Sequence, residues 1–152
     1  MTEQRFRYTA CGLDNIYLLD GFRVEVQGPH GPVAHIDNLE GLHRAIGEDL
    51  VRQRRSLNGK ELRYLRHELG LSQSNLADWL GESEQTVARR EKAKRRPAKP
   101  TPQERLIRFL YEEHIGGNEK LTEFLKGLAA LDEARAEGSW SFEDKTWHRK
   151  VA

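Results

Sequence analysis

The stretch from Leu69 to Pro97, LGLSQSNLADWLGESEQTVARREKAKRRP, has apolar residues at helical spacing and ends in a run of basic residues. Gly81 interrupts the pattern, and glycine is free to adopt the left-handed backbone of a tight turn. Ala77 is small enough to let two steeply crossing helices approach closely. The sequence therefore predicts two short helices that meet at a fixed set of apolar positions: Leu71, Leu76, Ala77, Leu80 and Val87.

The second of these helices has a polar outer face. With Ser83 as its N-cap and Val87 turned inward, four residues point outward: Glu84, Gln85, Ala88 and Arg89. Gln can form paired hydrogen bonds with adenine and Arg with guanine in the major groove of DNA, each worth about 1 to 3 kcal/mol of discrimination. We therefore predict that these four residues read bases. The alternative is that the two helices serve only packing or dimerisation.

ELRYLRHELGLSQSNLADWLGESEQTVARREK, in the centre of the chain, resembles the helix-turn-helix of the Cro/CI (XRE) superfamily, because Leu-Ser-Gln, Leu-Ala, Gly and a terminal Glu coincide in one register. The resemblance implies a five-helix DNA-binding domain. It also implies that Gln73 holds a phosphate and braces the reading residues, and that Arg66 and Glu91 form a partly buried structural ion pair. Arg90 departs from the pattern, since the family very often has a large apolar residue there.

Positive charge is concentrated around the same stretch. The chain has 152 residues and a net charge of +1, but residues 51–99 carry thirteen Lys or Arg against six acids, whereas residues 1–50 and 100–152 are both net negative. Such a basic segment is typical of a polyanion-binding surface, and a solvated charged surface is the alternative. We predict that sugar-phosphate contacts come from Ser72, Gln73, Thr86, Arg90, Lys92, Lys94, Arg95, Arg96 and Lys99.

The first third of the chain has a β pattern. A short apolar run at residues 15–19 is the first candidate strand, and it ends at Asp20-Gly21, a pair that suits a two-residue hairpin turn. Phe22, Val24 and Val26 then alternate with polar residues as a second strand. Residues 33–36 are a third candidate strand, and the apolar spacing then changes to that of a helix from about Asn38 to Arg54. We therefore expect an α+β fold, with a small N-terminal antiparallel sheet and helix before an all-α five-helix domain.

The C-terminal part begins with a clear helix start. Thr101 is a suitable N-cap, Pro102 fits the first helical position, and Glu104 completes a capping box. A further helix is expected from Asn118. The tail contains Trp140 and Trp147, so we expect it to pack, as an extra strand on the N-terminal sheet or across a dimer interface. The predicted domains are residues 1–57, 58–138 and 139–152.

Several classes of function lack their sequence signals. A single cysteine, Cys11, excludes an intramolecular disulfide and Cys-based zinc sites, and we expect it to be a buried structural thiol. The six histidines are scattered, no phosphate-binding or nucleophile motif occurs, and no apolar run reaches membrane length. We therefore expect a cytoplasmic protein that is not an enzyme, with no catalytic residues, metal, cofactor or membrane contact.

The domain order also resembles that of the MqsA-type antitoxins, dimeric proteins that repress their own operons. Those proteins bind zinc through paired Cys-x-x-Cys motifs, whereas this chain has Cys11 alone. We predict a sequence-specific, double-stranded-DNA-binding transcriptional regulator, a homodimeric autorepressor that reads a palindromic operator through residues 83–92. The alternative is an antitoxin or adaptor whose N-terminal domain binds a toxin or another protein.

Overall fold

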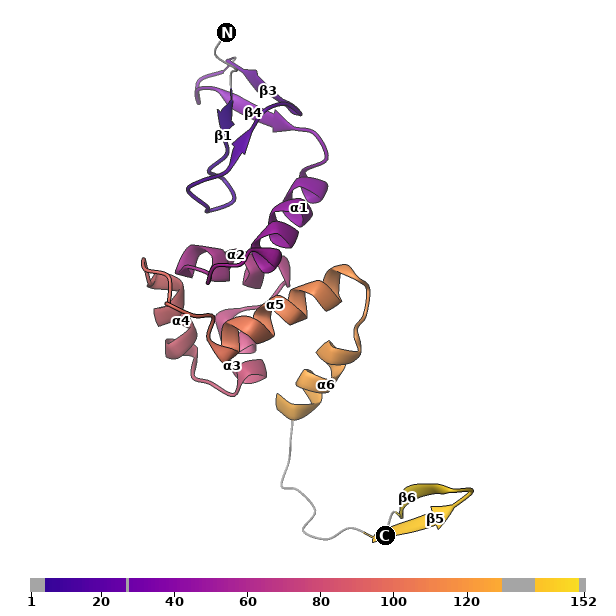
Figure 1. Cartoon of the computed structure of the whole chain (residues 1–152). Coiled ribbons are helices and arrows are strands. Elements are labelled where there is room, and N and C mark those ends of the chain that lie inside the picture. The colour runs from indigo at the N-terminus through magenta and orange to yellow at the C-terminus, as the bar shows by residue number, and fades with distance from the viewer. Residues whose placement is uncertain (1–4, 27, 130–138, 151–152) are drawn as a thin grey trace.

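The computed structural model describes residues 5–26, 28–129 and 139–150 and has an α+β fold (Figure 1). Within these residues, six helices lie between four N-terminal strands and one C-terminal hairpin. The strands are β1 (Phe6–Arg7), β2 (Tyr17–Leu18), β3 (Phe22–Glu25), β4 (Val33–Ile36), β5 (Ser139–Glu143) and β6 (Thr146–Lys150). The helices are α1 (Leu39–Arg52), α2 (Gly59–Glu68), α3 (Gln73–Leu80), α4 (Glu84–Lys92), α5 (Pro102–Ile115) and α6 (Lys120–Ala129).

The N-terminal strands form two separate antiparallel pairs, β1 with β2 and β3 with β4. The chain bends at Asp20-Gly21, with Gly21 at φ 72°, but the expected two-residue hairpin turn is wrong, because β2 and β3 do not pair. Two-residue β2 is too short for that ladder, whereas β4 offers β3 a four-residue partner from Phe22↔Ile36 to Glu25↔Val33. The rings of Phe6 and Phe22 stack at 5.1 Å and join the two pairs.

One hydrophobic core spans the predicted boundary after residue 57. Helix α1 packs against α2 and α5, so its apolar face meets the helices that follow the boundary. Leu13 of the β1–β2 segment reaches the same core, and Leu57 lies inside it. The central buried residues are Leu13, Ile46, Leu50, Leu57, Leu65, Leu76, Val87, Ile107 and Tyr111.

Two glycines permit close helix packing. A Cβ atom on Gly47 of α1 would lie 2.1 Å from the hydroxyl oxygen of Tyr111, so only glycine lets α1 and α5 come this close. A Cβ atom on Gly59, the first residue of α2, would lie 2.3 Å from the carbonyl oxygen of Glu91. The start of α2 therefore rests on the end of α4.

The start of α5 follows the sequence prediction in part. Thr101 accepts a hydrogen bond from the backbone N–H of Glu104, and Pro102 is the first helical residue. The reciprocal half of the predicted capping box is wrong, because the buried Glu104 carboxylate accepts a hydrogen bond from the backbone N–H of Leu57. This long-range contact joins α5 to the α1–α2 connection.

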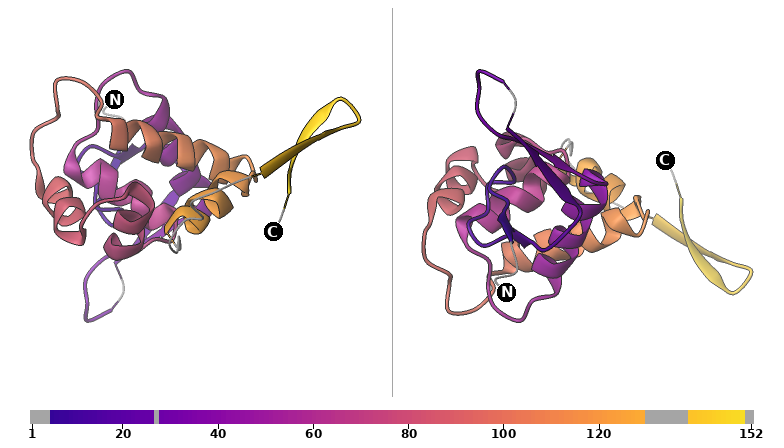
Figure 2. Two further views of the ribbon diagram at one scale, coloured as in Figure 1. Left: turned by 90° about the horizontal axis from the view of Figure 1, so that it is seen from below. Right: turned by 90° about the horizontal axis from the view of Figure 1, so that it is seen from above.

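The C-terminal residues 139–150 form a hairpin of their own, in which β5 and β6 pair from Ser139↔Lys150 to Glu143↔Thr146. The expected extra strand on the N-terminal sheet is therefore wrong, since each tail strand has the other as its partner. Trp140, Phe142 and Trp147 share one face and are each more than half exposed. Both views of Figure 2 show this hairpin apart from the helices.

Candidate nucleic-acid interface

Helices α3 and α4 form a helix-turn-helix. The hydroxyl of Ser72 caps α3 by accepting a hydrogen bond from Asn75 N, and that of Ser83 caps α4 by accepting one from Thr86 N. Gly81 ends α3 in the left-handed conformation, with φ 67° and ψ 35°. Leu76, Ala77 and Val87 are buried where the helices meet, so the two predicted short helices and their contact are confirmed.

The outer face of α4 has no partner within the described part of the chain. Glu84, Gln85 and Arg89 are exposed, and no hydrogen bond or ion pair joins their side chains to another described residue. Ala88 is half-buried on the same helix. Gln85 and Arg89 lie one helical turn apart, so their donors and acceptors are free to bind one external surface together.

A buried ion pair joins α2 to α4. Arg66 donates to Glu91 through Nε and Nη2, with 3.2 Å between Nη2 and Oε2, and only 8% and 5% of the two side chains are exposed. Gln73 Nε2 donates to the same carboxylate, and Arg66 Nη1 donates to the carbonyl of Leu71 at 2.9 Å. The Glu91 carboxylate therefore fixes the mutual orientation of α2, α3 and α4.

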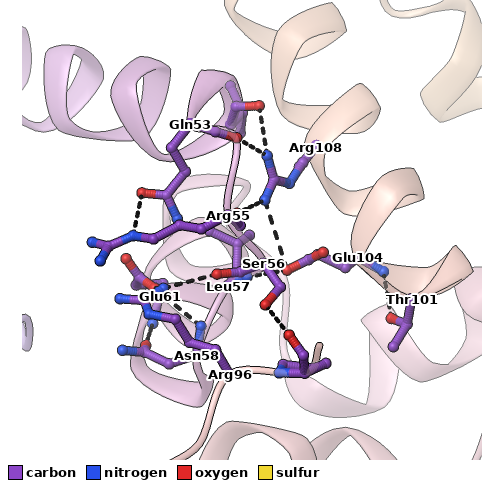
Figure 3. A network of polar contacts seen from close by, with 12 residues as sticks. Gln53, Arg55, Ser56, Leu57, Asn58, Glu61, Arg96, Thr101, Glu104 and Arg108 are labelled. Atoms are coloured by element: carbon purple, nitrogen blue, oxygen red, sulfur yellow. Dashed lines mark hydrogen bonds and ion pairs between the residues drawn. The ribbon is translucent and has the colours of Figure 1, made fainter. Parts of the chain in front are cut away.

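A polar network anchors the basic loop that follows α4 (Figure 3). Arg96 Nη1 donates to the carbonyl of Ser56 at 2.8 Å and pairs with Glu61, which is 2% exposed. The Ser56 hydroxyl donates to the carbonyl of Pro97. Sequence reasoning missed this role of Ser56 and Glu61, because both lie far from the loop along the chain. Arg96 thus has partners inside the protein, unlike the free phosphate ligand that the sequence predicts.

Arg90 also has an internal partner. Its guanidinium Nη1 donates to Glu82 in the turn between α3 and α4, and the Glu82 side chain is 11% exposed. Arg90 also lines a small apolar hollow with Leu62, Val87 and Ile107. It therefore lies beside apolar side chains while its charge is paired with Glu82.

The remaining cations of this region are free. Lys92, Lys94, Arg95 and Lys99 are exposed, and within the described residues none of them has an ion pair or side-chain hydrogen bond. Ser72 and Thr86 differ, since the Ser72 hydroxyl caps α3 and the Thr86 hydroxyl lies 2.8 Å from that of Ser83. These four free cations lie at the end of α4 and in the loop that follows it.

A hollow of about 480 Å³ lies between α2, the start of α3 and α4. It brings Ser72, Gln73 and Lys92 together with Arg63 and His67, which sequence reasoning did not assign to the site. Partial burial and the nearby Arg66 and Arg63 guanidinium groups lower the pKa of His67 below its ordinary value. Arg63 and His67 are four residues apart on a helix, and this spacing was the signal that could have placed them on one face.

Within residues 5–26, 28–129 and 139–150, no cluster of three or more His, Cys, Asp or Glu side chains is placed to hold a metal ion. No helix of these residues has both the length and the apolar composition that a membrane span requires.

Comparison with known families identifies a helix-turn-helix in the same region. Residues 62–101 match the family model described as "Helix-turn-helix", a segment that begins in α2 and ends at the cap of α5. The match supports a helix-turn-helix of the XRE type, the kind found in DNA-binding transcriptional regulators. No curated protein and no solved structure gives a significant match to the chain.

Proposed function

We propose that this chain, with its XRE-type helix-turn-helix, is a sequence-specific transcriptional repressor that binds as a homodimer to an inverted repeat. The observation that carries the proposal is the unpartnered face of α4, where Gln85 and Arg89 stand one turn apart on a rigidly held helix. Glu84, Gln85, Ala88 and Arg89 are the residues proposed to meet base edges in the major groove. Glu84 would accept a hydrogen bond from a cytosine amino group.

Phosphate contacts are assigned to the groups around this face. Lys92, Lys94, Arg95 and Lys99 supply free positive charge, which favours binding to any DNA sequence and weakens as salt rises. Ser72, Gln73 and Thr86 lie at helix starts, where backbone N–H groups also favour phosphate. Arg63 adds positive charge from α2, and His67 beside it can take up a proton when a phosphate binds.

Arg90 and Arg96 have a different role in this proposal. Their guanidinium groups pair with Glu82 and Glu61, so they contribute little free charge to a passing DNA strand. Arg96 instead anchors the basic loop to Ser56 and Glu61, and this restricts the path of the loop that carries Lys94 and Arg95. Loop rigidity lowers the entropy lost when the loop binds DNA.

Dimerisation follows from the size of the reading surface. One recognition helix contacts too few base pairs for useful specificity, and a two-fold dimer reads two half-sites one helical turn apart, about 34 to 36 Å. The uncovered aromatic face of the β5–β6 hairpin is one surface that a second copy could cover. A lone two-stranded hairpin is marginally stable in water, which favours such a contact.

The proposal is tested by fluorescence anisotropy on labelled DNA from the region upstream of the protein's own gene, with a scrambled duplex of equal length as control. Titrations between about 50 and 200 mM salt separate phosphate attraction from base reading. We expect tighter binding to the native duplex, with two chains per duplex by analytical ultracentrifugation. Equal, steeply salt-dependent binding to both duplexes would contradict base reading.

A second function is favoured by the N-terminal strands. Val24 and Val33 on the β3–β4 hairpin are 45% and 49% exposed, and Val26 beyond β3 is 77% exposed. Such side chains suit a protein partner, as in an antitoxin or adaptor. Native mass spectrometry of the chain purified from its own host would detect a stoichiometric partner, and loss of that partner in Val24→Ser/Val26→Ser, two positions on one face of the strand, would place the contact here.

A further inference from the structure

A second pocket lies on the side of α2 that faces the N-terminal strands. Its volume is about 400 Å³, within the range of pockets that hold small molecules. Three elements form it: the β1–β2 segment with Cys11 and Gly12, helix α1 with His43, and helix α2 with Arg63, His67 and Glu68. The pocket is separate from the outer face of α4.

The wall of this pocket is held by a chain of polar contacts. The hydroxyl of buried Tyr8 forms a hydrogen bond with His43 Nε2 at 2.8 Å, and the hydroxyl of buried Tyr64 donates to the carbonyl of His43 at 2.7 Å. His43 Nδ1 lies 3.6 Å from Glu68 Oε1 on the other side of the ring. Both ring nitrogens therefore have neighbours, so the imidazole is oriented before any ligand arrives.

The positive charges that line the pocket are not equally available. Lys60 is neutralised by Asp14, whose two carboxylate oxygens lie 2.8 and 2.9 Å from its ammonium nitrogen. Arg63 has no carboxylate partner within the described residues, and its one side-chain hydrogen bond there runs from Nε to His67 Nε2 at 3.4 Å. Its two terminal nitrogens are therefore free, in the planar arrangement that binds a carboxylate or phosphate through two hydrogen bonds.

Two residues connect this pocket to the DNA-facing hollow. Arg63 and His67 line both spaces, and the hollow also contains Ser72, Gln73 and Lys92 beside α4. An anion that binds Arg63 in the pocket therefore lies close to the hollow, well inside the Debye length of about 8 to 10 Å, and its charge acts on a phosphate there. The guanidinium group of Arg63 is therefore shared by the two spaces, so an anion bound in one competes for it with an anion bound in the other.

We propose that the pocket binds a small anionic molecule, whose carboxylate or phosphate group pairs with Arg63, and that this binding weakens the contact between the protein and DNA. The bound anion neutralises Arg63 and places negative charge next to the hollow that receives the DNA phosphate. The claim that the anion weakens DNA binding rests on the proposed DNA-binding function. The claim that the anion binds rests on the pocket alone.

Binding is tested without DNA, with inorganic phosphate and citrate as the probes. The imidazole resonances of His43 and His67 are followed by NMR at fixed pH, with sodium chloride used to keep the ionic strength constant. We expect saturable shifts with at least one probe, which also identifies the preferred anion. Arg63→Gln should abolish the shifts, whereas Arg105→Gln on α5 should retain them, since Arg105 is an exposed arginine outside the pocket. Shifts that do not saturate, or that persist in Arg63→Gln, would overturn the site.

Regulation is tested by repeating the DNA titration with the active probe at constant ionic strength. We expect the probe to lower the DNA affinity of the unaltered chain by at least about fivefold and to leave that of Arg63→Gln unchanged. An unchanged affinity in both would overturn the regulatory role. Absence of DNA binding without any probe would instead mean that the proposed function fails, and the NMR result would still decide the pocket.

Discussion

Arg66 and Glu91 face one another across the contact between α2 and α4, with 3.2 Å between Nη2 and Oε2 and almost no exposure to solvent. The carboxylate also accepts a hydrogen bond from Gln73 at the start of α3. The helix proposed to read bases is therefore held at its C-terminal end by the two helices behind it. The opposite, outward face carries Gln85 and Arg89 without partners among the described residues.

Breaking this pair is predicted to destabilise the fold. Glu91→Gln removes the charge and leaves the Arg66 guanidinium buried without compensation, which should lower the free energy of unfolding by about 3 to 5 kcal/mol. Glu84→Gln on the exposed face of the same helix is the control and should change it by less than about 0.5 kcal/mol. Urea unfolding measures the stability of both variants, and equal values would show that the ion pair does not stabilise the fold.

Gly47 gives a second stability prediction, on the contact between α1 and α5. Gly47→Ala places a methyl group against the hydroxyl of Tyr111, so it should destabilise the fold by about 1 to 3 kcal/mol. Gly127→Ala in α6 has open space around the new methyl group and should stabilise its helix by up to about 1 kcal/mol. Thermal unfolding of both variants should therefore give shifts of opposite sign. A stabilising Gly47→Ala would mean that the two helices pack less closely than described.

Substitution of Lys94 distinguishes attraction to phosphates from recognition of bases. This lysine is exposed and has no partner within the described chain, so its contribution to DNA binding should not depend on sequence. Lys94→Ala should weaken binding to native and scrambled duplexes alike and reduce the slope of log affinity against log salt by about one. Anisotropy titrations at several salt concentrations provide the slope, and an unchanged slope would remove Lys94 from the phosphate contacts.

The lowered pKa of His67 leads us to expect that DNA binding depends on pH. Partial burial, Arg66 and Arg63 lower its pKa, so the free protein holds the ring neutral near pH 7, whereas Glu91 and Glu68 oppose this effect more weakly. A phosphate beside the ring would stabilise its protonated form and raise its pKa, so binding takes up a proton. DNA affinity should therefore rise as pH falls from about 7.5 to 6, and this gain should be smaller in His67→Gln. Identical pH profiles for the two proteins would exclude a phosphate at His67.

Much of the central region could be predicted from the sequence, because its signals are local. Apolar spacing gives the helices, Gly81 and Ser83 give the turn, and Thr101 with Pro102 gives the start of α5. The contact between Arg66 and Glu91 was expected only through the resemblance to a family. Local spacing alone does not tell which acid meets which base across two helices.

The remaining features depend on contacts between distant segments. The partners of Arg96 are Ser56 and Glu61, which lie 40 and 35 residues earlier, and no local sequence pattern connects them to it. β1 and β2 have only two residues each, too few for an alternation to be recognised. The β5–β6 turn uses Asp144 and Lys145 at positive φ, and this pair is not among the usual hairpin turn signals.

The most direct test of the account is the ratio of affinities for the native upstream duplex and the scrambled duplex in Gln85→Ala/Arg89→Ala, measured beside the unaltered chain and Lys94→Ala. We expect the double variant to lose the preference, by about 2 to 6 kcal/mol for two bidentate contacts, and still to bind both duplexes through their phosphates. Lys94→Ala should keep the ratio. A double variant that keeps the full preference would contradict base reading by the outer face of α4.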